Sequence, residues 1–243
     1  MKLRTVTTMT PDTYRQHYIE FKRQEALTRK RFECEPQLAI AILTEDDATP
    51  PINRYHFYHT AWAVRAVAAL APARHVDIGG SRFFAGIASS VCPMTYVHPT
   101  APQIDLPEVT VVRADYTQLP FADASCASVS CMRVMDRHGL GRHGEAIDYD
   151  ADLKILAELK RITAPGGQLL LAVSVGRRAV LQFNSHRIYR DEDVRALLGD
   201  AFELVSMAMV PSTEPAPLVE NPTAAMLAEE DLGCGCYVWR RKA

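Results

Sequence analysis

Residues 75–81 read His-Val-Asp-Ile-Gly-Gly-Ser, and a further glycine follows at Gly86. This pattern predicts a short β-branched strand that ends in an acid and a glycine-rich turn, with a helix from Phe84 onward. In an open α/β sheet, such a turn brings backbone N–H groups to the carboxyl edge of the sheet, where nucleotide-like ligands bind. Taken alone, the stretch is also typical of a plain connection between a strand and a helix.

Two regions of different pattern flank residue 72. Residues 1–72 are predicted to form a helical extension or lid, with one helix from 11 to about 32 and another from Tyr55 to Leu70. Residues 73–243 alternate short apolar strands with helices, which predicts a doubly wound, mostly parallel α/β sheet. Strands are expected at 75–78, 94–97, 109–113, 127–131, 168–173, 202–210 and 235–240, and helices at 84–91, 150–162 and 191–199. The last two strands are predicted to form an antiparallel hairpin at the sheet edge.

Composition narrows the classes of function. The chain has 243 residues, 48% of them hydrophobic, and a formal net charge of −2. This charge gives no global field that would favour nucleic acid. There is also no apolar run of the roughly 18 residues that span a bilayer, and no signal-peptide pattern at the start. We therefore expect a cytoplasmic protein that binds neither nucleic acid nor membrane, while a homodimer stays open. The dispersed cysteines are expected to be reduced packing thiols, and no metal is predicted.

Four segments in a fixed order carry a family resemblance. The glycine-rich turn is followed by VVRADY at 111–116, LPFADAS at 119–125 and ELKRITAPGG at 158–167. This ordered set resembles the class I S-adenosylmethionine-dependent methyltransferases, in particular the methyltransferase-11-like branch. The resemblance covers roughly residues 73–240 and implies a seven-stranded, Rossmann-like methyltransferase domain.

Three further segments resemble a smaller methyltransferase-like family, the domain-of-unknown-function-268 type. They are GLGRHG at 139–144, NSHRIY at 184–189 and GCGCYV at 233–238. Members of this family are often associated with polysaccharide or secondary-metabolite genes. The resemblance thus implies a biosynthetic setting but no particular substrate.

The methyltransferase resemblance implies S-adenosyl-L-methionine as cofactor and suggests which residues hold it. Asp77 would orient the methionine amino group, and a glycine turn lets the backbone approach a ligand. Asp115 would accept from the adenine amine, although it could instead only cap a turn, and Ser81 could be a plain helix cap. The predicted cofactor-binding residues are Asp77, Gly79, Gly80, Ser81, His98, Asp115, Tyr116, Met132 and Arg133.

One position departs from the family pattern. His98 stands where class I methyltransferases usually carry an acid that accepts hydrogen bonds from both ribose hydroxyls. A neutral imidazole can accept only one hydrogen bond. Asp105 could substitute only if its loop folds back. Three outcomes follow: weaker cofactor binding, a different binding mode, or loss of the cofactor.

Residues 133–145, RVMDRHGLGRHGE, are expected to form a loop at the edge where an acceptor would lie. His138 is the candidate general base, oriented by Asp136 or Glu145, and His186 could reach the same pocket. The candidates for binding a carboxylate or phosphate of the substrate are Arg137, Arg142 and His143. Alternatively, the loop is a solvated charged segment and the residues before His186 only make a turn.

These features together predict an S-adenosylmethionine-dependent methyltransferase for a small-molecule or carbohydrate-like acceptor, with transfer to O or N. Its rate would come mainly from alignment of the reacting groups. Two alternatives stay open at this point. One is a non-catalytic methyltransferase-like scaffold or regulatory protein, and the other is an enzyme of this fold that catalyses a different reaction.

Overall fold

The computed structural model describes residues 7–8, 10–27, 36, 44–45, 53–142, 144–213 and 217–243. It divides the chain into two units, Met1–Asn53 and Arg54–Ala243. This division differs from the boundary that we expected at residue 72. The helix that begins at Arg54 belongs to the second unit and not to an N-terminal extension.

The described residues of the first unit form one helix and a pair of two-residue strands. Strand β1 (Thr7–Thr8) pairs antiparallel with β2 (Thr44–Glu45). Helix α1 spans Pro11–Ala26, with an acid in its first turn and a basic residue in its last. Both charges complement the helix dipole. The helix ends before residue 32, and the rest of the predicted segment lies largely outside the described residues.

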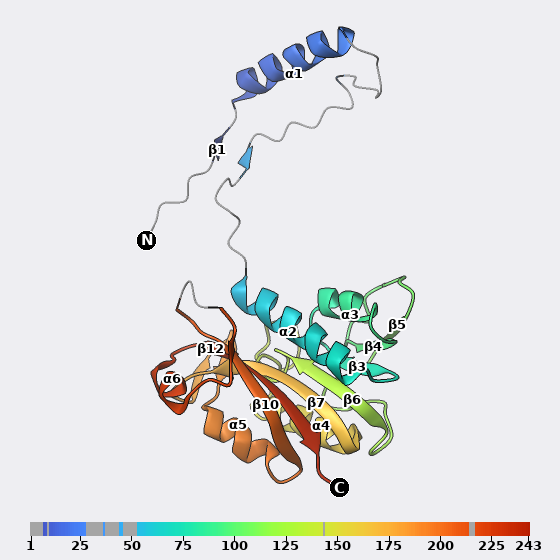
Figure 1. Ribbon diagram of the computed structural model, residues 1–243, viewed down its shortest axis with the longest axis vertical. Coiled ribbons are helices and arrows are strands. Elements are labelled where there is room, and N and C mark those ends of the chain that lie inside the picture. Colours follow the sequence, from blue (N-terminus) through green and yellow to red (C-terminus); the bar gives the residue numbers. More distant parts are fainter. Residues whose placement is uncertain are drawn as a thin grey trace. The chain divides into compact units, whose positions relative to one another are not determined.

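The second unit is built on an eight-stranded sheet with the order β11-β10-β12-β7-β6-β3-β4-β5 (Figure 1). The strands are β3 (His75–Ile78), β4 (Met94–Val97), β5 (Val109–Val112), β6 (Cys126–Met132), β7 (Thr163–Val175), β10 (Phe202–Val210), β11 (Val219–Glu220) and β12 (Gly233–Arg241). Strands β3 to β7 pair in parallel. The mostly parallel, doubly wound α/β sheet is thus confirmed, with the short β11 as an eighth strand.

Strands β10 and β12 form the antiparallel hairpin that we expected at this end of the sheet, and β12 is its inner strand. It pairs antiparallel with β10, as predicted, but also antiparallel with β7. Residues 233–239 of this strand are all buried. A strand that is covered on both faces and has no polar alternation belongs in the interior of a sheet. The segment between β10 and β12 contains β11 and the short helix α6 (Ala224–Glu229).

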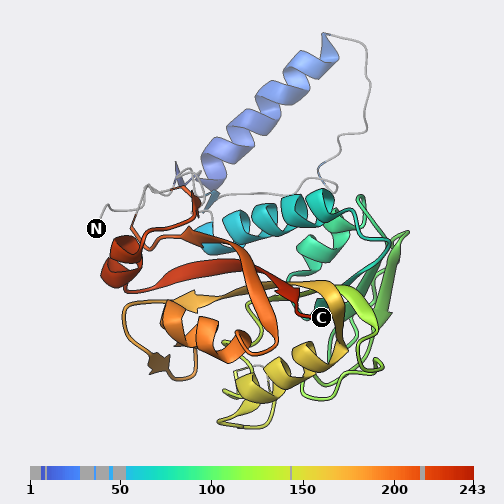
Figure 2. The same ribbon diagram turned by 60° about the horizontal axis from the view of Figure 1, so that its bottom comes forward.

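Helices cover both faces of the sheet (Figures 1 and 2). On one face lie α2 (Arg54–Leu70) and α3 (Arg82–Ala88), and on the other lie α4 (Ala151–Ile162) and α5 (Asp191–Leu198). Successive side chains of a strand point to opposite faces. Accordingly, Leu170 packs in the cluster with Trp62 of α2, whereas Leu171 packs in the cluster with Ile155 of α4. Helix α2 is therefore a layer of the domain itself, because Ala63 and Val67 are fully buried.

The glycine-rich turn between β3 and α3 has the predicted form. Gly79 adopts a φ of +66° and Ser81 caps the helix, its Oγ accepting from the backbone N–H of Phe83 at 3.2 Å. Helix α3 begins at Arg82, two residues before the expected start. A cap oxygen satisfies a backbone donor that the first helical turn leaves without a partner.

A small hairpin, β8 (Val180–Gln182) with β9 (His186–Ile188), follows β7. The sequence does not reveal it, since three-residue strands are too short for a periodic pattern. Five cysteines are buried free thiols, and Cys34 lies outside the described residues. In the part of the chain that the structure describes, no helix is long and apolar enough to cross a membrane.

Candidate functional site

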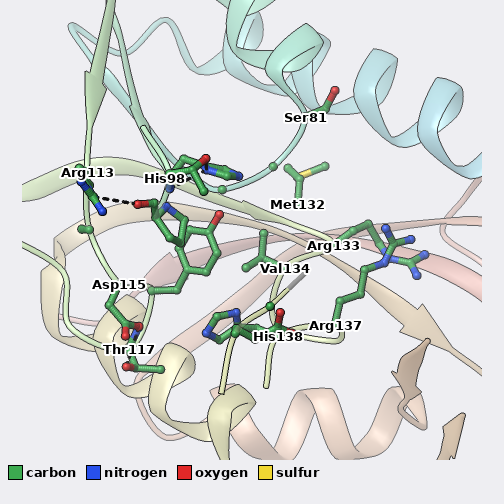
Figure 3. A pocket seen from close by; sticks show the side chains of 18 of the residues that line it. Ser81, His98, Arg113, Asp115, Thr117, Met132, Arg133, Val134, Arg137 and His138 are labelled. Atoms are coloured by element: carbon green, nitrogen blue, oxygen red, sulfur yellow. Dashed lines mark hydrogen bonds between the residues drawn. The ribbon is translucent and has the colours of Figure 1, made fainter. Parts of the chain in front are cut away.

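A pocket of about 970 Å³ opens at the carboxyl ends of the parallel strands (Figure 3). It is lined by His56, residues 79–81, 98–100, 113–117, 132–134 and 137–138, residues 144–146, and Asp148. Residues 79–81, 98–100, 113–117 and 132–134 lie at or directly after the ends of β3, β4, β5 and β6. The pocket therefore lies where an open α/β sheet binds its ligands.

Most of the residues predicted from sequence line this pocket. The cofactor candidates among them are Gly79, Gly80, Ser81, His98, Asp115, Tyr116, Met132 and Arg133, and the loop candidates are Arg137 and His138. Those that do not line it are Asp77, Asp136, Arg142 and His186. His143 lies outside the described residues.

Asp77 is fully buried at the end of β3. Its Oδ1 accepts from the Ser130 hydroxyl at 2.5 Å, and the backbone N–H of Gly80 also donates to this carboxyl. Burial raises its pKa to about 7. The carboxyl thus fixes the turn and the neighbouring strand, and it is a poor counter-ion for the amino group that we assigned to it from sequence.

The two glycines of the turn make room for protein side chains. A Cβ on Gly79 would overlap the Tyr116 ring, with Cε1 only 2.5 Å away. A Cβ on Gly80 would lie 3.0 Å from the Cβ of Met132. The sequence-based explanation, in which a Cβ would collide with the ligand, is therefore incomplete. The atoms nearest to a Cβ on Gly79 belong to the phenol of Tyr116, which packs against the turn.

His98 has a defined tautomer in this arrangement. The backbone N–H of Thr100 donates to its Nδ1 at 3.2 Å, so in the neutral ring the proton is on Nε2. The imidazole stacks on Tyr96, with ring centroids 5.8 Å apart, and meets Tyr116 edge-on at 6.1 Å. The other ring nitrogen, Nε2, thus carries the proton and is a hydrogen-bond donor, where the family's usual acid offers acceptors. Asp105 is exposed and does not line the pocket, so it does not replace that acid.

Asp115 lines the pocket and also caps a turn. Its Oδ1 accepts from both the backbone N–H and the hydroxyl of Thr117, each at 2.8 Å. The backbone hydrogen bond is the main cause of a lowered pKa, which keeps the carboxyl charged at neutral pH. The two interpretations of Asp115 are therefore compatible, because a carboxylate has further lone pairs that can accept from a ligand.

His138 lines the pocket on the same side as Asp115 (Figure 3). It is partly buried, and its ring meets Tyr116 edge-on with centroids 5.2 Å apart. Burial lowers its pKa, while the nearby carboxylates of Glu145 and Asp115 act in the opposite direction. A lowered pKa leaves the imidazole neutral at pH 7 and able to accept a proton.

We expected Asp136 to orient His138 and His186 to reach the pocket, but neither side chain lines the pocket. Asp136 is fully buried, and its Oδ2 lies 2.8 Å from Nε of Arg133 and 3.0 Å from the Ser174 hydroxyl. It positions Arg133 and not His138. His186 is in β9, where its Nδ1 lies 2.8 Å from the Ser185 hydroxyl. Among the described residues, no group of three or more His, Cys, Asp or Glu side chains is arranged to hold a metal ion.

Several lining residues were missing from the set predicted from sequence. His56 of α2 lies 2.9 Å from the Ser81 hydroxyl through its Nε2. Arg113 follows β5 and donates from Nε to the carbonyl of Pro99 at 3.1 Å. Glu145 and Asp148 extend the loop after β6 into the pocket wall. A signal for Arg113 was present, since it stands two residues before Asp115 at a strand end. His56 could not be placed, because α2 is remote in sequence.

Comparison with known families extends the sequence evidence. The family described as "Caenorhabditis protein of unknown function, DUF268" matches residues 112–227. This range includes the LPFADAS segment, the loop after β6 and NSHRIY, whereas GCGCYV lies beyond it. No curated protein matches the chain.

Solved structures match about three quarters of this chain. One is a SAM-dependent methyltransferase of Thermotoga maritima, a possible histamine N-methyltransferase (TM-score 0.51, 18% identity, 78% of this chain and 92% of that one). Another is the 1,6-didemethyltoxoflavin-N1-methyltransferase of Burkholderia thailandensis with bound S-adenosylhomocysteine (0.51, 16%, 78% and 84%). A third is the [4+2]-cyclase SpnF (0.52, 17%, 76% and 80%). The protein thus has the fold of the class I S-adenosylmethionine-dependent methyltransferases, and it matches the DUF268 family over residues 112–227.

Proposed function

We propose that the protein is an S-adenosylmethionine-dependent methyltransferase that acts at O or N of a small-molecule or carbohydrate-like acceptor. The observation that carries this proposal is the convergence of residues after β3, β4, β5 and β6 on one pocket. Eight of the nine residues that the family resemblance suggests for the cofactor line this pocket, and Asp77 is the exception.

The pocket has the size and the polar groups that S-adenosylmethionine requires. Its volume of about 970 Å³ is at the upper end of the range for small-molecule sites. Asp115 would accept from the adenine amine, and Nε2–H of His98 would donate to a ribose hydroxyl oxygen. The residues present therefore fit the cofactor, with fewer acceptors for the ribose than an acid would give. When bound, the cofactor supplies an electrophilic methyl group on its sulfonium.

The acceptor would be prepared by residues of the loop after β6. His138 has a lowered pKa and lines the pocket, so it would take the proton of an acceptor hydroxyl at Nδ1 or Nε2. The carboxylates of Glu145 and Asp115 would stabilise the resulting imidazolium. Asp136 has no part in this step, because its carboxylate is buried and forms an ion pair with Arg133.

The proposal is tested by isothermal titration calorimetry with S-adenosylhomocysteine on the full chain. We expect one site per chain, and at least about tenfold weaker binding in Asp115→Asn, since the adenine amine then loses a charged acceptor. Asp105→Asn is the matched control, because Asp105 is exposed and outside the pocket. No binding at millimolar ligand would refute the proposal.

His98 gives a sharper prediction. In His98→Asp, the new carboxylate can accept from a ribose hydroxyl, whereas the wild-type imidazole offers a donor there. We expect S-adenosylhomocysteine to bind about tenfold more tightly to this variant, as a charged hydrogen bond typically contributes. His98→Asn is the uncharged control and should change the affinity much less. Weaker binding to the Asp variant would show that the ribose lies elsewhere.

One observation favours a second candidate, an enzyme of this fold that catalyses another reaction. The donor at His98 differs from the usual cofactor contact, and one protein with the same fold is a [4+2]-cyclase. Methyl transfer from radiolabelled S-adenosylmethionine to any acceptor would exclude this candidate. A non-catalytic scaffold role, a biosynthetic setting, a homodimer and a cytoplasmic location stay predictions from sequence.

A further inference from the structure

The end of the pocket opposite Asp115 is rich in cations (Figure 3). The guanidinium groups of Arg133 and Arg137 lie together there, and the charge of Arg133 contributes to a lowered pKa of Arg137. The same two arginines lower the pKa values of His56 and His186, in addition to burial. Cationic and imidazole groups from α2, β9 and the loop after β6 therefore share one neighbourhood.

Among the described residues, only Arg133 of the two arginines has an ion-pair partner. Arg133 is buried, lies 2.8 Å from the Asp136 carboxylate through Nε and donates from Nη2 to the Ser174 hydroxyl at 2.6 Å. Its charge is thus matched within the fold. Asp136 is itself fully buried and does not line the pocket.

Burial and the charge of Arg133 lower the pKa of Arg137 more than the charge of Asp136 raises it. Arg137 lines the pocket and is partly buried, and its Nε is buried without a hydrogen-bond partner. Within the part of the chain that the structure describes, its side chain has neither an ion pair nor a hydrogen bond. Even partial burial of a cation that has no ion-pair partner is costly. An anionic ligand at this point would offset that cost.

We propose that Arg137, with Arg133 behind it and His56 beside it, binds a carboxylate or phosphate group of the methyl acceptor. This inference rests on the proposed function and names the substrate class of the same site. Arginine suits the role because its planar guanidinium can donate two parallel hydrogen bonds to either group. His56 is held in place by the Ser81 hydroxyl at 2.9 Å.

The charges favour the acceptor over the amino-acid end of the cofactor. That end carries an ammonium group as well as a carboxylate, and the ammonium would lie among cations. The acid that could have paired with it, Asp77, is fully buried and bonded to Ser130. The carboxylates that line the pocket, Asp115, Glu145 and Asp148, belong to segments on the His138 side. A ligand with net negative charge gains more at Arg137 than a zwitterion does.

The test compares three ligands on the full chain: inorganic phosphate, S-adenosylhomocysteine, and 5′-methylthioadenosine, which lacks the amino-acid end. They are titrated into the wild type, Arg137→Gln and the control Arg178→Gln, which removes an exposed arginine outside the pocket. In Arg137→Gln we expect phosphate to bind at least about tenfold more weakly and both nucleosides to bind within about twofold of wild type. Arg178→Gln should match the wild type throughout.

Each other outcome has a distinct meaning. If Arg137→Gln weakens S-adenosylhomocysteine tenfold but not 5′-methylthioadenosine, Arg137 holds the cofactor carboxylate and the inference is wrong. If phosphate binds wild type and Arg137→Gln equally, or binds neither, the inference is also wrong. If neither nucleoside binds the wild type while phosphate binding still depends on Arg137, the proposed function fails but the anion subsite stands.

A measurement on the wild type covers the case in which Arg137→Gln does not fold. The pKa of His56 can be followed by NMR, with its signal assigned from His56→Gln. Phosphate bound beside His56 would favour the charged imidazolium and raise this pKa. We expect a rise on addition of phosphate, and an unchanged pKa at phosphate saturation would overturn the inference.

Discussion

At the residue scale, the turn after β3 depends on contacts with residues that are distant in sequence, so local sequence does not reveal them. Gly79 has a φ of +66° and lies directly under the Tyr116 ring. Asp77 is buried below the same turn, with Ser130 and the Gly80 N–H as its partners. Both residues therefore make stability contributions that are separable from ligand binding.

Gly79→Ala should lower the free energy of unfolding by about 2–4 kcal/mol. About 1 kcal/mol comes from the positive φ and the rest from the overlap with Tyr116. Gly166→Ala is the matched control, because its φ is +72° and nothing lies within 4 Å of the added Cβ. Urea denaturation measures both variants. Equal losses in the two would show that the Tyr116 contact carries no cost.

Asp77→Asn should change how stability depends on pH. The native pKa of about 7 lies above the ordinary value of 3.8, so between these pH values the folded protein binds more protons than the unfolded chain. Stability of the wild type therefore falls as pH rises through this window, by up to about 1.4 kcal/mol per pH unit, and Asn removes that loss.

Unfolding free energies at pH 4 to 8 test this prediction on Asp77. We expect the variant to gain stability relative to the wild type by at least about 1 kcal/mol between pH 5 and pH 8. Because all other groups are shared, the difference isolates Asp77. A difference that stays constant with pH would contradict the raised pKa.

At the element scale, two family motifs form a clamp between α4 and the loop before β6. Arg161 of α4 donates to the carbonyls of Leu119 at 3.0 Å and Phe121 at 2.7 Å. It also pairs with Asp123 and Glu158, while Glu158 accepts from the Leu119 N–H at 2.6 Å. The segments LPFADAS and ELKR thus owe their pattern to these structural contacts, and none of their residues lines the pocket.

Arg161→Lys should lower the free energy of unfolding by about 1–2 kcal/mol. A lysine ammonium cannot reproduce the planar set of donors that reaches two carbonyls and two carboxylates. Arg240→Lys is the control, since it alters a single exposed pair with Glu203 and should cost less than about 0.5 kcal/mol. Chemical denaturation compares the two variants, and equal effects would rule out the clamp.

At the scale of the whole molecule, the described hydrophobic core belongs to the second unit. Both buried clusters, from Trp62 to Trp239, lie within Arg54–Ala243. The described residues that line the pocket also belong to this unit. The second unit therefore contains the residues that a folded domain and its site require.

Removal of residues 1–53 should leave the unfolding midpoint within about 3 °C of the full chain, because the burial that stabilises the domain is retained. Differential scanning calorimetry measures it. A larger fall would show that the first unit stabilises the second. A change in S-adenosylhomocysteine affinity at unchanged midpoint would support the lid role expected for the N-terminal region.

The sequence by itself determined the class of fold and the edge at which the site forms. The hydrophobic periodicity of strands and helices is a property of neighbouring residues, and the glycine turn requires a specific backbone conformation. Both can therefore be predicted from local sequence. The starts and ends of β3, β4 and β10 were predicted correctly for that reason. The order of the motifs then indicated which strand ends converge.

Only the tertiary structure decided which charged side chains reach the pocket. Asp136 and Arg137 are adjacent in sequence, yet one is buried against Arg133 and the other lines the pocket. Likewise, Ser174 of β7 donates to Asp136, and α2 brings His56 to Ser81. Burial and partners depend on segments far apart in the chain, so charge, protonation and access at the site could not be obtained from local sequence.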